Sequence, residues 1–168
     1  TLAQTYLGAL KSTKAGDAAP SLLIHSQKAG TALLDHLGRA ARLHAKETTG
    51  LPAFVIPLAV EHIASTGIDL WLGSLAYGFG EVLLLLSGDE DPGYRLALTE
   101  QVDLANSILV AMGYSKRIQC ITANSSEDIA PVSKVMAELR QRKAHKLLAS
   151  PASFALSLQK RETLETSL

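Results

Sequence analysis

The sequence predicts a three-layer α/β sandwich, in which a parallel sheet of about four strands is covered by helices on both faces. Short apolar runs of strand length alternate along the chain with longer segments whose apolar residues recur at helical spacing. Such alternation favours parallel pairing, because each helix supplies the crossover that a parallel neighbour requires. Residues 82–86 (VLLLL) are apolar at every position, which is typical of a strand covered on both faces.

The first strand is expected at residues 21–26 (SLLIHS), followed by a helix that begins near Gly30. A second strand is expected at residues 53–58 (AFVIPL). Pro57 cannot donate a backbone hydrogen bond, so we expect the strand to finish there or to lie at an edge of the sheet.

The third strand follows a helix that we expect Ser65 or Thr66 to cap and whose Trp71 we expect to cover the sheet. After the strand at 82–86, Pro92 is placed to open a long helix that Gly113 closes.

A fourth strand is expected at residues 117–122, and Ser125 or Ser126 is expected to cap the helix after it. Glu127 and Asp128 would then lie in the first turn of that helix, where its dipole favours negative charge.

The composition fits one domain with a full core, since the chain has 168 residues of which 47% are hydrophobic. We expect residues 21–148 to form the α/β domain, residues 1–20 an N-terminal helix and linker, and residues 149–168 a helical extension. Sixteen basic side chains balance sixteen acidic ones. No global charge therefore favours nucleic acid or an acidic membrane surface as a partner.

The chain has one cysteine, Cys120, which excludes a disulfide framework and a multi-cysteine metal site. A lone cysteine fits a reducing compartment, so we expect a cytoplasmic protein. The longest apolar run, within residues 81–87, is far shorter than the ~20 residues that cross a bilayer, and the N-terminus lacks the pattern of a signal peptide. The helical pattern that continues to Leu168 suggests a piece of a longer protein.

Polar residues follow the first three predicted strands. Because the carboxyl ends of parallel strands meet at one edge, where ligands bind in open α/β sheets, we expect an interaction or ligand site there. The candidate residues are His25, Ser26, Gln27, Glu61, His62, Gly88, Asp89 and Glu90.

Several chemistries remain open at this edge. His25 and His62 with neighbouring carboxylates could bind a divalent metal, although solvent-facing loops are polar in any case. Asp89, Glu90 and Asp91 precede Pro92 and its helix, where carboxylates commonly serve as caps. A serine nucleophile at Ser26 or Ser87 would lack the glycine-flanked elbow, and no loop has the spacing of a phosphate-binding loop.

Cys120 lies inside the predicted fourth strand, between Gln119 and Ile121. A thiol in such a place usually behaves as a small buried hydrophobe. We therefore expect Cys120 to be buried and slow to react.

Two segments carry a resemblance to a known family: FVIPLAVEHIASTGIDLWLGSLAYGFGEVLLLLSGDEDPGYR and LVAMGYSKRIQCITANSSED. Their order of elements resembles the iron-sulfur (delta-type) subunit of methyl-viologen-reducing hydrogenase and heterodisulfide reductase complexes. In that family, cysteine-bearing loops hold a small iron-sulfur cluster at the strand ends. The corresponding loops here are AVEHI and SGDED, so the resemblance assigns no ligand to this chain.

The chain is more similar to a cysteine-poor version of this domain in bacterial 4Fe-4S ferredoxin-like proteins. The tail LQKRETLETSL resembles the helix that leads from that domain toward the cluster-binding part. The resemblance implies a non-catalytic domain of an electron-transfer protein that docks ferredoxin-type domains of the same chain or a redox partner. It also implies 4Fe-4S clusters in the parent protein and no cofactor in this chain.

Two other functions fit the same pattern. A small flavodoxin-like enzyme or ligand-binding domain would use the same strand-end loops, with a metal on His25 and His62 as one form of it. A homodimer could form through an exposed edge strand or the amphipathic terminal helices.

Overall fold

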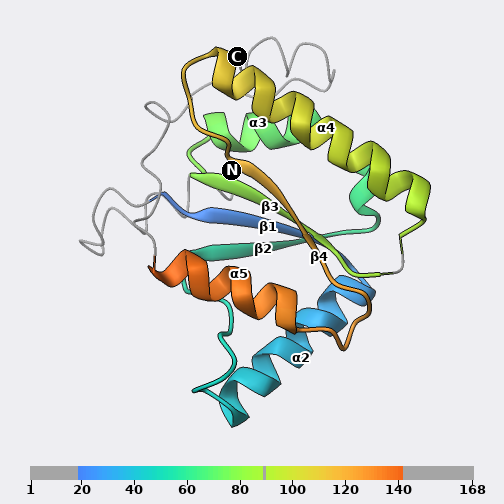
Figure 1. Cartoon of the computed structure of the whole chain (residues 1–168), viewed down its shortest axis with the longest axis vertical. Helices are drawn as coiled ribbons and strands as arrows, with labels where there is room; N and C mark the ends of the chain where they lie inside the picture. The colour runs from blue at the N-terminus through green and yellow to red at the C-terminus, as the bar shows by residue number, and fades with distance from the viewer. Residues whose placement is uncertain (1–18, 89, 142–168) are drawn as a thin grey trace.

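The computed structural model describes residues 19–88 and 90–141, which form a doubly wound α/β sandwich (Figure 1). Its elements in chain order are β1 (Ser21–Ser26), α2 (Ala29–Leu43), β2 (Val55–Val60), the short 3-10 helix η1 (Ile63–Ser65), α3 (Ile68–Ala76), β3 (Glu81–Leu86), α4 (Pro92–Ala111), β4 (Ile118–Thr122) and α5 (Ala130–Gln141). The helix expected before residue 19 and the extension expected at 149–168 lie outside the described residues.

The sheet has four parallel strands in the order β2-β1-β3-β4, so the predicted three-layer α/β class is confirmed. Ser21 of β1 lies opposite Val55 of β2 on one side and opposite Glu81 of β3 on the other. The strands therefore start level with one another, and their carboxyl ends finish along one edge. This edge is the place where doubly wound sheets bind ligands.

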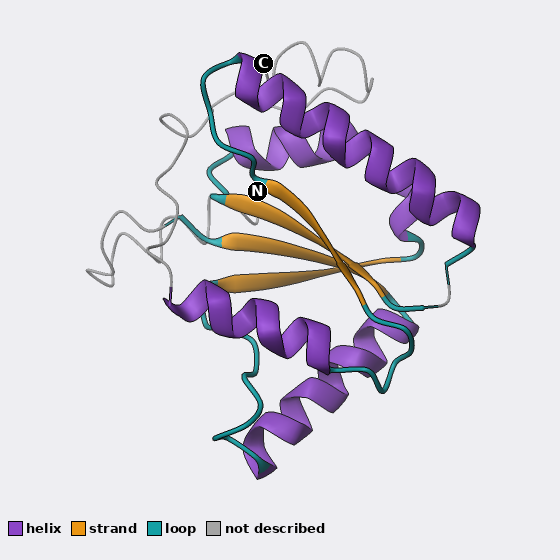
Figure 2. Cartoon of the chain, viewed as in Figure 1, coloured by secondary structure: helices purple, strands orange, loops and turns teal. Residues whose placement is uncertain are grey.

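The two central strands are buried along their whole length, since every residue of β1 and of β3 is buried. Figure 2 shows a helix layer on each side of the sheet. Leu22 and Ile24 pack with α3 and α4 on one face, whereas Leu23 packs with α2 and α5 on the other. The period of two in a strand sends neighbouring side chains to opposite faces, which explains why β3 needs leucine at almost every position.

Two expected boundaries in the first half of the chain are wrong. β2 continues through Pro57 to Val60 rather than finishing at the proline. Pro57 is accommodated because β2 is an edge strand with one neighbour, β1, which was the other arrangement expected for a strand that contains proline. α3 begins at Ile68 with Gly67 at its N-cap, and neither Ser65 nor Thr66 caps it.

The last helix also starts later than expected, at Ala130, and has no acidic residue in its first turn. Asp128 instead accepts hydrogen bonds from the backbone and side-chain nitrogens of Asn124, at 3.0 and 2.9 Å. The Glu127 N–H donates to the Ser125 hydroxyl at 3.2 Å. These side chains hold a turn after β4, because short polar side chains compete with the helix for backbone partners.

The long helix α4 starts at Pro92, as predicted, and the Asp91 carboxylate caps it by accepting from the Gly93 N–H at 2.7 Å. Gly113 follows the helix with a φ of +85°, as expected of a glycine that ends a helix. Trp71 on α3 is fully buried against the sheet, which confirms its predicted role in the core.

A buried amide joins α4 to the start of β4. Asn106 donates to the Ile118 carbonyl at 2.8 Å and accepts from the N–H groups of Arg117 and Ile118 at 3.0 and 3.1 Å. Three backbone groups at the sheet edge are thereby satisfied by one side chain. Asn106 fixes the position of α4, whose N-terminus borders the candidate site.

Within the part of the chain that the structure describes, no helix combines the length and the apolar composition that crossing a membrane requires.

Gly38→Ala is expected to stabilise the protein, because Gly38 lies in the middle of α2 and nothing lies within 4 Å of the position an alanine Cβ would take. Alanine in an exposed helix interior is favoured over glycine by about 0.5–1 kcal/mol. The midpoint of thermal unfolding should rise by about 1–4 °C. A lower midpoint would show that α2 does not tolerate the added methyl group.

Candidate functional site

The candidate site lies where the chain changes direction across the sheet. From β1 the chain crosses to β2 on one side, whereas β3 and β4 lie on the other side of β1. At the carboxyl edge, the chain leaving β1 and the chain leaving β3 therefore run to opposite sides of the sheet. The place between these two strand ends is the topological switch point of a flavodoxin-like sheet. Ser26 ends β1 at this point, and Ser87 directly follows β3.

The two serines are joined to each other. Their hydroxyl oxygens lie 3.1 Å apart, and the Ser26 hydroxyl also accepts from the Gly30 N–H at 2.8 Å. Both side chains are almost fully buried, with 6% of Ser26 and 2% of Ser87 exposed. This pair connects the β1 loop, the first turn of α2 and the end of β3.

The loop after β3 is closed by the side chain of Glu90. One carboxylate oxygen accepts from the Ser87 N–H and the other from the Gly88 N–H, both at 3.1 Å. The first of these oxygens also lies 3.4 Å from the Ser87 hydroxyl. Gly88 has a φ of +94°, which allows two successive N–H groups to point at one anion.

A pocket of about 570 Å³ opens beside this loop on the α4 side of the sheet. The volume falls within the roughly 300–1,000 Å³ that small-molecule sites occupy. Its lining residues are Ser26, His62, Ile63, Ala64, Ser65, Glu90, Asp91 and Tyr94. The pocket thus combines the β1 end, the β2 loop with η1, the β3 loop and the first turn of α4.

Four of the predicted site residues form or border this pocket. Ser26, His62 and Glu90 line it, and Gly88 holds the loop that carries Glu90. Sequence reasoning missed Tyr94, which lines the pocket with 60% of its surface exposed. Its position in the first turn of the helix that follows a strand end was the available signal.

The other predicted residues lie elsewhere. His25 is buried toward α2, beside Gly30, and its Nδ1 lies 3.0 Å from the Ser26 carbonyl oxygen. Gln27 is exposed and its N–H donates to the Val60 carbonyl at 2.8 Å. Glu61 is exposed and does not line the pocket. Asp89 lies outside the described residues.

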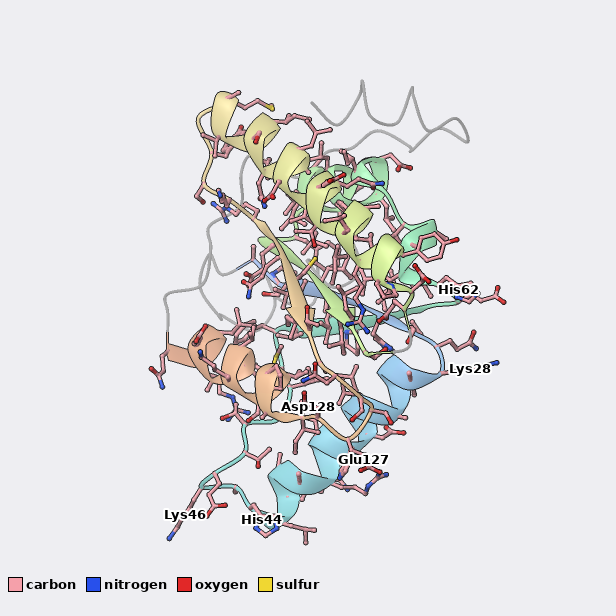
Figure 3. The ribbon with its side chains drawn as sticks, turned by 45° about the vertical axis from the view of Figure 1, so that its right-hand side comes forward. Lys28, His44, Lys46, His62, Glu127 and Asp128 are labelled. Atoms are coloured by element: carbon pink, nitrogen blue, oxygen red, sulfur yellow. The ribbon has the colours of Figure 1, made fainter. Side chains whose placement is uncertain are left out.

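The structure does not bring His25 and His62 to one place. His25 packs beside Gly30 of α2, whereas His62 lines the pocket. Figure 3 shows His62 near Lys28, at the carboxyl edge of the sheet. Among residues 19–88 and 90–141, no three side chains of the His, Cys, Asp and Glu types are grouped so that they could hold a metal ion.

The arrangement around Ser26 also differs from that of a serine hydrolase. The Ser26 hydroxyl is bonded to Ser87 and to the Gly30 N–H, and neither partner is a general base. A reactive serine needs an imidazole or another base within hydrogen-bond reach. The Ser26 hydroxyl is therefore not arranged as an activated nucleophile.

Cys120 is partly buried, rather than fully buried as the sequence predicts, since β4 is an edge strand of the sheet. Partial burial, followed by the nearby Asp103 carboxylate, raises the pKa of the Cys120 thiol from 9.0 to about 11. Both effects disfavour the thiolate, which is the reactive form.

Cys120 should consequently react slowly with iodoacetamide. A rise in pKa of two units lowers the thiolate fraction about 100-fold at pH 8, so the native protein should be labelled about 100-fold more slowly than the urea-unfolded chain. Asp103→Asn should raise the native rate while leaving the unfolded rate unchanged. Equal native and unfolded rates would contradict the raised pKa.

The fold and the pocket define this chain as a doubly wound α/β protein with a switch-point pocket at the carboxyl edge of the sheet. No family model matches the chain, and no curated protein matches it either.

Proposed function

We propose that this chain is a cytoplasmic, non-catalytic α/β domain that docks a redox partner at the carboxyl edge of its sheet. The resemblance to the domain of 4Fe-4S ferredoxin-like proteins implies that the partner is a ferredoxin-type domain, in the same chain or in another protein. The 4Fe-4S clusters would belong to this partner. The observation that carries the proposal is the hydrogen-bonded state of the edge. Ser26, Ser87 and Glu90 bond to one another and to backbone N–H groups, and these bonds hold the loops of the edge in a preformed arrangement that a partner can recognise.

The charges at this edge favour a partner that presents a basic face. The described loops after the strands contain one basic side chain of the Lys or Arg type, Lys28, which is exposed. Their carboxylates are Glu61, Glu90, Asp91, Glu127 and Asp128. Complementary charge steers association and fixes the orientation of a docked partner.

Nuclear magnetic resonance can test the docking directly. A 4Fe-4S ferredoxin domain in its reduced, paramagnetic state should broaden the amide signals of residues near the carboxyl edge, Ser26 and His62 among them. Figure 3 places His44 and Lys46 at the opposite end of α2 from Lys28, so their signals should stay sharp. Broadening at His44 and Lys46, or none at all, would contradict docking at this edge.

A matched pair of charge reversals gives the control. Glu61→Lys changes the proposed surface, whereas Glu47→Lys makes the same change in the exposed loop after α2. For exposed charges, Glu61→Lys should weaken binding by about two- to five-fold at low salt and Glu47→Lys should leave it unchanged. An equal effect of both variants would show that net charge alone controls the association.

A second candidate function is the binding of a small ligand, and the pocket of about 570 Å³ at the switch point favours it. Native mass spectrometry of the purified protein should then show an added mass that denaturation releases. Filling the pocket by Ser65→Trp should reduce that added mass, since Ser65 lines the pocket and is exposed. A native mass equal to that of the polypeptide would favour partner docking over ligand binding as the function of the carboxyl edge.

A further inference from the structure

We propose that Glu90 determines the specificity of the switch-point pocket by filling, with its own carboxylate, the backbone N–H pair that a ligand's phosphate or carboxylate would otherwise occupy. The pocket would then accept ligands that enter it with a neutral or cationic group and would exclude anions. This inference rests on the second candidate function, small-ligand binding at the pocket.

The backbone geometry after β3 has the features of an anion site. The N–H groups of Ser87 and Gly88 are consecutive, and both point at one carboxylate at 3.1 Å. The positive φ of Gly88 produces this arrangement, which in other proteins forms a concave nest for phosphate or other anions. In flavodoxin-like sheets the ligand lies at the same place, between the first and third strands.

Glu90 occupies that nest from inside the pocket. Its side chain belongs to the same loop, three residues after Ser87, and it lines the pocket beside Ser26. Being part of the chain, the carboxylate competes with any free anion at a high effective concentration. Its negative charge and that of Asp91, which also lines the pocket, repel a second anion.

The backbone around Glu90 explains how this carboxylate is held. Two N–H donors satisfy its two carboxylate oxygens, and charge-assisted bonds of this kind are stronger than neutral ones. Replacing the carboxylate would remove the acceptor that both N–H groups share. A free anion could then take its place.

Inorganic phosphate is a suitable probe, because it needs no knowledge of the natural ligand. In the unmodified protein, millimolar phosphate should leave the amide signals of Ser87 and Gly88 unchanged in nuclear magnetic resonance spectra. In Glu90→Ala the same two signals should shift and saturate, with binding at least about tenfold tighter than in the unmodified protein. Glu90→Gln, which keeps the shape and loses the charge, gives a second variant if Glu90→Ala does not fold.

Glu100→Gln is the matched control, since Glu100 is exposed on α4 and the change in net charge is the same as in Glu90→Gln. Its Ser87 and Gly88 signals should not respond to phosphate. The proposal would be overturned if phosphate shifts these signals in the unmodified protein, or if neither Glu90 variant responds. The titration reads the N–H pair itself, so its failure is distinguishable from the absence of a natural ligand in mass spectrometry.

Discussion

Gly88→Ala is expected to lower the free energy of unfolding by about 2–5 kcal/mol. Part of the loss, about 1–2 kcal/mol, is the strain of an L-residue at the φ of +94° that Gly88 adopts. The rest comes from overpacking, which typically costs about 1–3 kcal/mol. An alanine Cβ would lie 2.4 Å from the carbonyl oxygen of Asn124 and 2.6 Å from its carbonyl carbon, and both are backbone atoms.

Urea unfolding followed by circular dichroism would measure this effect, and Gly113→Ala separates its two causes. Gly113 has a similar φ of +85°, but nothing lies within 4 Å of the position its Cβ would take. Strain alone should therefore cost Gly113→Ala about 1–2 kcal/mol. Equal losses in the two variants would show that the loop after β4 moves away from Gly88 at little cost.

Gly88→Ala should also disturb the candidate site. The loop that Gly88 forms supplies both N–H groups that the Glu90 carboxylate accepts. In a Gly88→Ala protein that remains folded, the amide signals of Ser87 and residue 88 should move, whereas those near Gly113 should not. Unchanged signals would mean that the glycine conformation is not needed to hold Glu90.

Trp71→Ala is expected to cost about 3–5 kcal/mol, the usual range for removing a large aromatic side chain from a core. Trp71 has no exposed surface and packs between α3 and the sheet, with Leu22 and Leu84 in the same apolar cluster. Its indole N–H also donates to the Thr66 hydroxyl at 3.2 Å. The truncation would leave a cavity and remove a hydrogen bond at the turn that precedes α3.

Circular dichroism should follow this unfolding, because Trp71 is the one tryptophan of the chain and its fluorescence is lost with it. Thr66→Val keeps the shape but removes the hydroxyl that accepts from the indole and donates to the Ile63 carbonyl at 2.7 Å, so it should cost about 1–3 kcal/mol. Trp71→Phe should fall between the two variants. A Trp71→Ala protein as stable as the parent would contradict the assignment of α3 to the core.

The candidate site could be predicted in part, for a reason of topology. Parallel strands end at one edge, so Ser26, His62 and Glu90 could be expected near one another from the strand pattern alone. The direction of each side chain depends on the exact last residue of its strand. His25 and Ser26 are neighbours in sequence, but the His25 ring packs beside Gly30 of α2 whereas Ser26 lines the pocket.

The sequence by itself determined the class of fold and the edge that carries the polar loops. Apolar runs and helical spacing report burial, which is the main term in folding, and they are visible in any single sequence. The sequence pattern did not determine the start of α5, because a short polar side chain can bond either to the first turn of a helix or to a nearby loop. The turn from Asn124 to Asp128 used the residues that the pattern had assigned to α5.

Only the tertiary structure decided which polar groups meet. Three examples are the bonds from Asn106 to the backbone of β4, the link between the Ser26 and Ser87 hydroxyls, and the closure of the β3 loop by Glu90. Each requires that its donor and acceptor be positioned to within a few tenths of an ångström. Ser26 and Ser87 are 61 positions apart in sequence and come together through the pairing of β1 with β3. Hydrogen bonds are directional and short, so the sequence pattern shows which groups are available, and the packed fold selects their partners.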